Sequence, residues 1–125
     1  MIFIGEYNSV YIEGEVLMEF REGEHICITL VFGFGYDCEF GPFSRLAEQN
    51  LSQIGDADAK WPDYLHENGF TAGNAYEIPV EIKVYDDFDE DSVRYMLKKF
   101  RKQVTESGIN IGLLEIRKGN ETIDG

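Results

Sequence analysis

The chain is poor in the residues on which metal, redox and nucleophilic chemistry depends. Its 125 residues include only two cysteines and two histidines. Their spacing matches neither CxxC nor HExxH, and the sequence has no GxxxxGK[ST] phosphate loop. Cys27 and Cys38 favour a reduced protein over a disulfide framework, because a domain of this length buries an adequate core without cross-links. We therefore expect no metal, no cofactor and no enzymatic activity.

Long apolar runs are also absent. No stretch approaches the ~20 consecutive apolar residues that a membrane-spanning helix needs. The first ten residues, MIFIGEYNSV, lack the basic region and the apolar length of a secretory signal peptide. The sequence therefore predicts a cytoplasmic protein that does not bind membranes.

Basic residues are scarce relative to acidic ones. The chain has 11 Lys and Arg against 24 Asp and Glu, for a net charge of −13. A surface of this sign repels the phosphate backbone of nucleic acids and attracts basic proteins. Two interpretations stay open, because the charge either keeps a small protein soluble or recognises a basic partner. In neither case do we expect direct binding of DNA or RNA.

Hydrophobic residues make up 43% of the chain, which is typical of a globular domain. Alternating or continuous apolar patterns predict strands over residues 2–7, 10–20, 25–34, 76–85 and 109–117. Residues 15–34 are expected to form a hairpin whose second strand is central and covered on both faces. Pro79 has no N–H group to donate, which favours either a sheet edge or irregular pairing for the strand that contains it.

Two amphipathic patterns predict helices. One covers about residues 43–54 and the other about 89–107, and a glycine follows each of them as a stop signal. Between the helical patterns, residues 56–75 have no clear period and are expected to be irregular, with one helical turn at 62–67.

These elements define the fold class as α+β. The expected order is β-β-β-α-loop-β-α-β, with a mainly antiparallel sheet of about five strands and two helices packed on it. Residues 1–118 are expected to form the single domain, and residues 119–125 a polar C-terminal tail.

The densest charge lies in residues 85–91, YDDFDED. A calcium loop that begins at Asp87 needs glycine at its sixth position and glutamate at its twelfth, where this chain has Ser92 and Lys98. The start of a helix explains the cluster better, because acids stabilise the positive end of the helix dipole. Asp86 and Asp87 come too early for that role, so they remain candidates for contact with a partner.

Other acidic residues recur at positions that favour an exposed binding surface. Those on the second strand share one face, where like charges repel one another and a basic partner would relieve the repulsion. Those in loops lie beside aromatic residues, and we expect Trp61 and Tyr64 to be exposed as hot-spot anchors. The candidate partner-binding residues are Glu13, Glu15, Glu19, Asp37, Glu39, Asp58, Trp61, Asp63, Tyr64, Asp86 and Asp87.

A catalytic alternative depends on residues that only folding can bring together. Asp37 and Glu39 are paired carboxylates suited to acid–base work, and His66 completes this set. A second version groups Cys38 with Asp37 and His66. The flanking glycines and aromatic residues favour an ordered loop instead.

A small acidic α+β domain without catalytic motifs resembles the immunity proteins of bacterial toxin systems, such as those of contact-dependent growth inhibition. The resemblance implies a monomer or weak dimer that binds a cognate, basic toxin, often a nuclease, and occludes its active site or substrate surface. Two alternatives stay open beside it. One is a nucleic-acid mimic of the anti-restriction type, and the other is a small enzyme that uses Asp37, Glu39 and His66.

Overall fold

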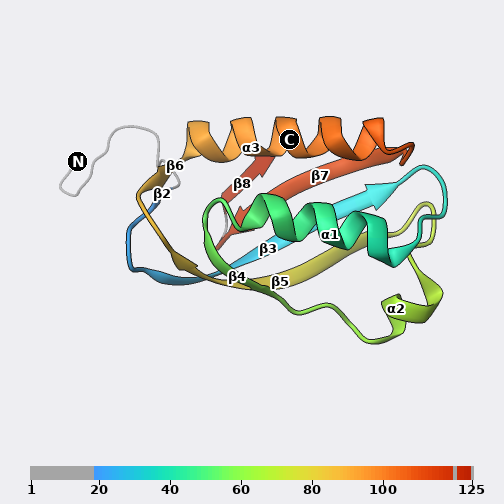
Figure 1. Ribbon diagram of the computed structural model, residues 1–125, viewed down its shortest axis with the longest axis horizontal. Coiled ribbons are helices and arrows are strands. Elements are labelled where there is room, and N and C mark those ends of the chain that lie inside the picture. Colours follow the sequence, from blue (N-terminus) through green and yellow to red (C-terminus); the bar gives the residue numbers. More distant parts are fainter. Residues whose placement is uncertain (1–18, 120, 125) are drawn as a thin grey trace.

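The computed structural model describes residues 19–119 and 121–124 of the chain. They fold as a five-stranded antiparallel sheet of order β4-β5-β3-β7-β8, with helices on one side of it (Figure 1), so the predicted α+β class is confirmed. The elements are β2 (Glu19–Phe20), β3 (His25–Phe34), α1 (Phe40–Leu51), β4 (Gly55–Ala59), α2 (Tyr64–Asn68), β5 (Ala75–Val84), β6 (Phe88–Asp89), α3 (Glu90–Glu106), β7 (Ile111–Lys118) and β8 (Glu121–Asp124).

The centre of the sheet is β3, as the sequence predicts. It pairs with β5 on one side and β7 on the other, so that Leu30 lies between Ile78 and Ile116 in register. All three side chains are buried. They belong to the face covered by α1 and α3, which lie on the same side of the sheet (Figure 1).

The opposite face of the sheet has no helix over it in the part of the chain that the structure describes, so the expectation that β3 is covered on both faces is wrong. Val31 is nevertheless buried on this face. It lies in register between Glu77 and Glu115, and Arg117 forms ion pairs with both, at 3.5 and 3.3 Å. These long side chains span β3 and shield Val31 from water.

Both expected helices are confirmed. α1 starts three residues earlier than predicted, with Pro42 in its first turn, where a missing N–H group is tolerated. At the start of α3, the Asp89 carboxylate accepts a hydrogen bond from the Ser92 N–H at 2.8 Å, as expected of an N-cap. α3 buries one stripe of side chains: Val93, Met96, Leu97, Phe100 and Val104.

The segment expected to be irregular contains both a strand and the short helix α2, whose turn was predicted at 62–67. In β4, of sequence GDADA, exposed aspartates alternate with glycine and alanines that are more buried, so no apolar pattern marks the strand. Because β4 pairs with β5, the prediction that β5 is an edge strand is wrong. The carbonyl of Pro79 accepts a hydrogen bond from Lys60 N at 2.9 Å, just past the end of β4. In an antiparallel strand the N–H and the carbonyl of one residue point to the same side. The N–H that proline lacks would therefore face the β4 side, and its absence removes no hydrogen bond to β3.

The C-terminal residues were expected to be a polar tail, but residues 121–124 form β8 and pair with β7. Ile123 is buried, which anchors the strand to the core. On the N-terminal side, Glu19 and Phe20 of the expected hairpin pair with β6 rather than β3. The remaining residues predicted as strands before Glu19 lie outside the described part of the chain. Among the described helices, none combines the length and apolar character that crossing a bilayer requires.

Candidate functional site

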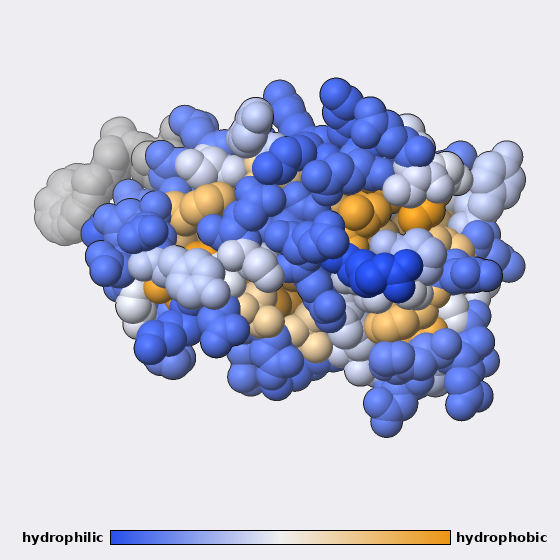
Figure 2. Space-filling model, viewed as in Figure 1, coloured by the Kyte–Doolittle hydropathy of each residue, from blue (hydrophilic) through white to orange (hydrophobic). Residues whose placement is uncertain are grey.

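A pocket of about 630 Å³ lies between the first turn of α1 and the helix α2. Its lining comes from residues 37–42, Arg45 and residues 66–70. Figure 2 shows apolar surface in the region between the two helices, with hydrophilic side chains around it. We call this site the α1–α2 pocket.

The backbone of the α1–α2 pocket is fixed by an isolated antiparallel bridge between Cys38 and Phe70. Cys38 N donates to the Phe70 carbonyl at 3.0 Å, and Phe70 N donates to the Cys38 carbonyl at 2.7 Å. Gly69 has a φ of 67°, and a Cβ at that position would stand 2.7 Å from the Cys38 oxygen. Only glycine fits this close approach without moving the backbone.

Aromatic rings form one wall of the pocket and connect it to the core. Phe40 lies against His66 with ring centroids 4.3 Å apart, and against Trp61 at 5.2 Å. Behind them, the buried Phe70 packs edge-to-face against Phe32 at 5.2 Å. The wall is therefore held by the hydrophobic core rather than by a free loop.

Charged groups at the pocket have few partners. Asp37 accepts a hydrogen bond from the Ala72 N–H at 2.8 Å. Glu39 occupies the N-cap position of α1 without a side-chain capping bond. Within residues 19–119 and 121–124, none of the ion pairs involves Glu39, Glu67 or Arg45. In this part of the chain, two carboxylates and one guanidinium at the pocket therefore have no ion-pair partner.

The pocket also contains the residues of both catalytic alternatives, since Asp37, Cys38, Glu39 and His66 all line it. Burial raises the pKa of the Cys38 thiol, and the nearby charge of Glu39 raises it further. The Cys38 Sγ lies 3.3 Å from the Glu39 carbonyl oxygen, to which it donates. This environment stabilises the thiol rather than the reactive thiolate, so it opposes a nucleophilic role for Cys38.

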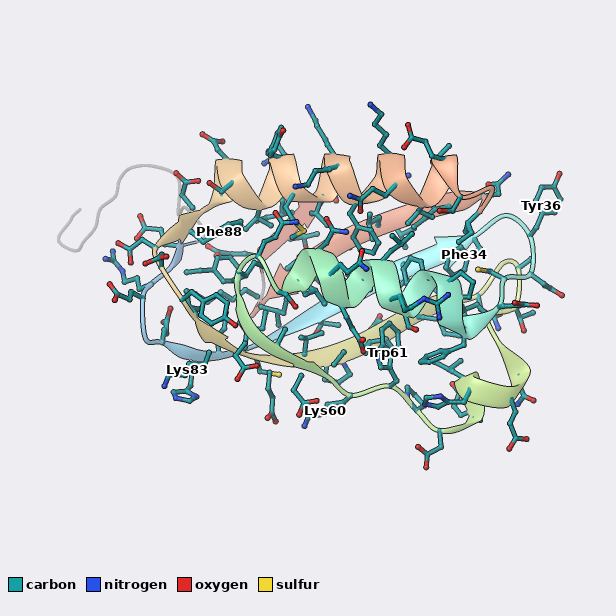
Figure 3. All side chains as sticks on the ribbon, viewed as in Figure 1. Phe34, Tyr36, Lys60, Trp61, Lys83 and Phe88 are labelled. Carbon is teal, nitrogen blue, oxygen red and sulfur yellow. The ribbon has the colours of Figure 1, made fainter. Side chains whose placement is uncertain are left out.

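Several predicted partner-binding residues lie at or beside the pocket. Asp37 and Glu39 line it, while Asp63 precedes α2 and Tyr64 begins it. Tyr64 is 58% exposed, as expected. The expected exposure of Trp61 is wrong, because it packs against the core and its Nε1 donates to Glu48 at 3.0 Å. Figure 3 shows Trp61 close to α1, whereas Tyr36 projects away from the molecule.

A second group of predicted residues lies at the opposite end of the molecule, where β2 meets β6 (Figure 1). There Asp87 accepts from the Glu22 N–H at 2.9 Å, and Glu19 pairs with Arg21 at 2.6 Å. We call this surface the acidic corner, which consists of Glu19, Glu22, Glu24, Asp86, Asp87 and Asp89.

The remaining predicted residues belong to neither region. Asp58 forms an ion pair with Lys60 at 2.5 Å, beside the open face of the sheet. Glu13 and Glu15 lie outside the described residues. Among the residues that are described, no three His, Cys, Asp or Glu side chains are grouped so as to hold a metal ion.

The candidate partner-binding residues predicted from the sequence did not include Phe40, Arg45 or Glu67, which line the pocket. The first turn of α1 carries Phe40, and Arg45 follows one turn later, so their spacing places both near the start of the helix. Glu67 reaches the same place only through the bridge between residues 38 and 70, for which the sequence has no local signal.

Searches against protein-family models, curated proteins and solved structures gave no significant match to this chain.

Proposed function

We propose that this chain is a cytoplasmic acidic binding protein that neutralises a basic partner, of the kind represented by toxin nuclease domains. One observation carries this function: the α1–α2 pocket presents carboxylates that the fold does not use, beside a fixed aromatic wall. A basic surface that docks there would gain the pairing that the protein itself does not supply.

Exposed tyrosines beside the pocket support the same function. Tyr36, next to Asp37, is 72% exposed, and Tyr64 at the start of α2 is 58% exposed. Tyrosine is enriched among the residues that dominate binding energy, because its ring buries a large area and its hydroxyl stays hydrogen-bonded. The surface therefore combines charge for orientation with rings for desolvated contact.

The mechanism is occlusion. The net charge of −13 accelerates encounter with a basic partner, and the effect weakens as salt screens the charges. Close contact around α2 then buries an interface on the order of 1,600 Å², which excludes substrate from the partner's active site or substrate surface.

The decisive experiment starts from the gene immediately upstream, where a toxin–immunity pair would place the toxin. Its C-terminal domain is expressed alone and together with this chain, while growth and nuclease activity are measured. Co-expression should restore growth, and the purified proteins should form a complex that weakens with salt. Persistent toxicity in the presence of this chain would refute the function, and inhibition of several unrelated DNA-binding enzymes would replace it with nucleic-acid mimicry.

One structural observation favours a second candidate, a small enzyme: Asp37, Glu39 and His66 line the same pocket. The purified chain and its His66→Ala variant should be compared on chromogenic ester, phosphate and glycoside substrates. Turnover by the wild type that is lost in a folded His66→Ala variant would establish this candidate instead.

A further inference from the structure

The α1–α2 pocket offers two kinds of surface to one ligand. Phe40 and His66 form a wall with their ring centroids 4.3 Å apart and their planes at 45°. Glu39, at the start of α1, and Glu67, in α2, are exposed carboxylates on the two elements that flank this wall. A ligand that fits must therefore be flat enough to lie on rings and able to donate hydrogen bonds to carboxylates at its edge.

A guanidinium group meets both conditions. Its plane stacks on an aromatic face, while its N–H groups donate within the plane to carboxylates, often two at a time. A lysine ammonium is a point charge, so it gains the charge interaction without the stacking or the bidentate geometry.

We infer that the α1–α2 pocket is a receptor for a guanidinium group, namely an arginine side chain that the basic partner inserts, and this inference rests on the proposed function. The volume of about 630 Å³ lies within the range of pockets that hold small ligands, so an arginine side chain enters together with part of its backbone.

The pocket is organised before the ligand arrives. Hydrogen bonds between Cys38 and Phe70 fix its floor, and Phe70 is fully packed in the core. One oxygen of Asp37 is already held by the Ala72 N–H, which fixes this side of the pocket. The backbone of the pocket therefore loses little conformational entropy on binding, and the main ordering cost is that of the Glu39 and Glu67 side chains.

Arg45 allows a test of whether the ligand of the pocket is a cation or an anion. Its Nη1 atom lies 3.1 Å from the place that a Cβ on Gly41 would occupy, so the guanidinium sits over the first turn of α1 at the pocket. There it repels an incoming cation and attracts an anion. Removing its charge with Arg45→Gln should strengthen the binding of a cation, and it would weaken the binding of an anion.

The experiment is a titration of the isotope-labelled full chain with N-acetyl-L-arginine N-methylamide, followed by backbone amide NMR shifts. We expect shift changes confined to residues 37–45 and 66–70, with Kd on the order of millimolar for this isolated side chain. The lysine analogue should bind at least about 3-fold more weakly, because it cannot stack. Arg45→Gln should lower Kd.

The double variant Glu39→Gln/Glu67→Gln removes both uncompensated charges and should raise Kd by about 10-fold or more. Its matched control is Asp86→Asn, an exposed acid of the acidic corner, which should leave Kd unchanged. Urea unfolding of each variant checks that the exposed substitutions have left the fold intact.

The inference would be overturned by shift changes elsewhere on the protein, by weaker binding in Arg45→Gln, or by preference for N-acetyl-L-glutamate N-methylamide. Much tighter binding of free L-arginine than of the blocked amide would also overturn it, by indicating a small-molecule ligand. If the toxin domain is neutralised equally well by the Glu39→Gln/Glu67→Gln variant, this inference fails and the proposed function stands. If the wild type does not neutralise it, the proposed function fails.

Discussion

The acidic corner and the α1–α2 pocket are both rich in carboxylates, yet they use them differently. At the corner the fold uses four of the six acids: Asp89 caps α3, and Asp87 accepts from the Glu22 N–H in the turn before β3. Glu19 forms an ion pair with Arg21, and Glu24 forms one with Lys118. At the pocket, Glu39 and Glu67 form neither a capping bond nor an ion pair within the described residues.

This difference shows that the density of acids along the sequence is a poor guide to a binding surface. The densest run, at residues 85–91, mostly builds a helix start and a turn. Glu39 and Glu67 at the pocket are better placed for a partner, because neither forms an ion pair within the described residues and because aromatic rings lie beside them.

The largest expected effect comes from removing the ring that joins the pocket to the core. Phe70→Ala should lower the free energy of unfolding by about 3–5 kcal/mol, because it leaves a cavity among packed aromatic rings. The measurement is urea denaturation followed by tryptophan fluorescence. The exposed Tyr36→Ala variant should change stability by less than about 0.5 kcal/mol. A loss below about 1 kcal/mol for Phe70→Ala would show that the pocket is not part of the core.

The next effect concerns binding of the proposed partner. Glu39→Lys/Glu67→Lys should weaken the complex by about 100-fold, because it places like charges at the desolvated centre of the contact. Glu22→Lys/Asp86→Lys makes the same change in net charge at the acidic corner and should cost less than about 10-fold at physiological salt, where distant charges are screened. Calorimetric titration measures both, and equal losses would erase the distinction between the two regions.

A smaller effect is expected on the reactivity of Cys38, which reports the charge of Glu39 at the pocket. Burial and the Glu39 carboxylate both raise the pKa of Cys38, so Glu39→Gln should lower that pKa and speed alkylation of Cys38 a few-fold near pH 8. The Cys27→Ser background isolates the thiol, and mass spectrometry after iodoacetamide treatment gives the rate. An unchanged rate would mean that the Glu39 charge does not act on this pocket.

The smallest effect is at the acidic corner. Asp89→Ala should lower the urea midpoint because the Ser92 N–H loses its acceptor, whereas Asp89→Asn should keep most of the cap. The hydrogen bond from Ser92 N holds the pKa of Asp89 below its ordinary value of 3.8. The charged form therefore adds stability above that value, and this stability is lost as pH falls through the lower folded-state pKa. Urea midpoints at pH 7 and pH 3 should show the difference between wild type and Asp89→Asn shrinking at the lower pH.

Much of the fold was predictable because its main elements carry strong periods. The stripe of α3, the alternation of β5 and the apolar run of β3 all marked elements that the structure contains. The error at β3 was to expect cover on both faces. The even-numbered positions of β3 carry large residues such as Phe32 and Phe34, and the odd-numbered positions carry smaller ones such as Cys27 and Thr29. The strand therefore alternates in side-chain size, although its polarity changes little.

Other elements lacked a sequence signal. β4 has only alanines and a glycine on its inner positions, and β8 has one buried apolar residue, Ile123, so neither gives a detectable apolar period. The pocket was hidden for a different reason. It depends on Gly69 meeting the Cys38 carbonyl, a contact between distant segments that no local propensity encodes.

That contact at Gly69 also limits how the protein can diversify. Because no larger residue fits against the Cys38 carbonyl, the frame that presents residues 39 and 67 requires glycine at position 69, whereas the exposed side chains on it can be exchanged. A directed-evolution library that keeps position 69 and randomises these two neighbours would explore new specificities on a constant scaffold. Randomising position 69 as well would fill the library with misfolded members.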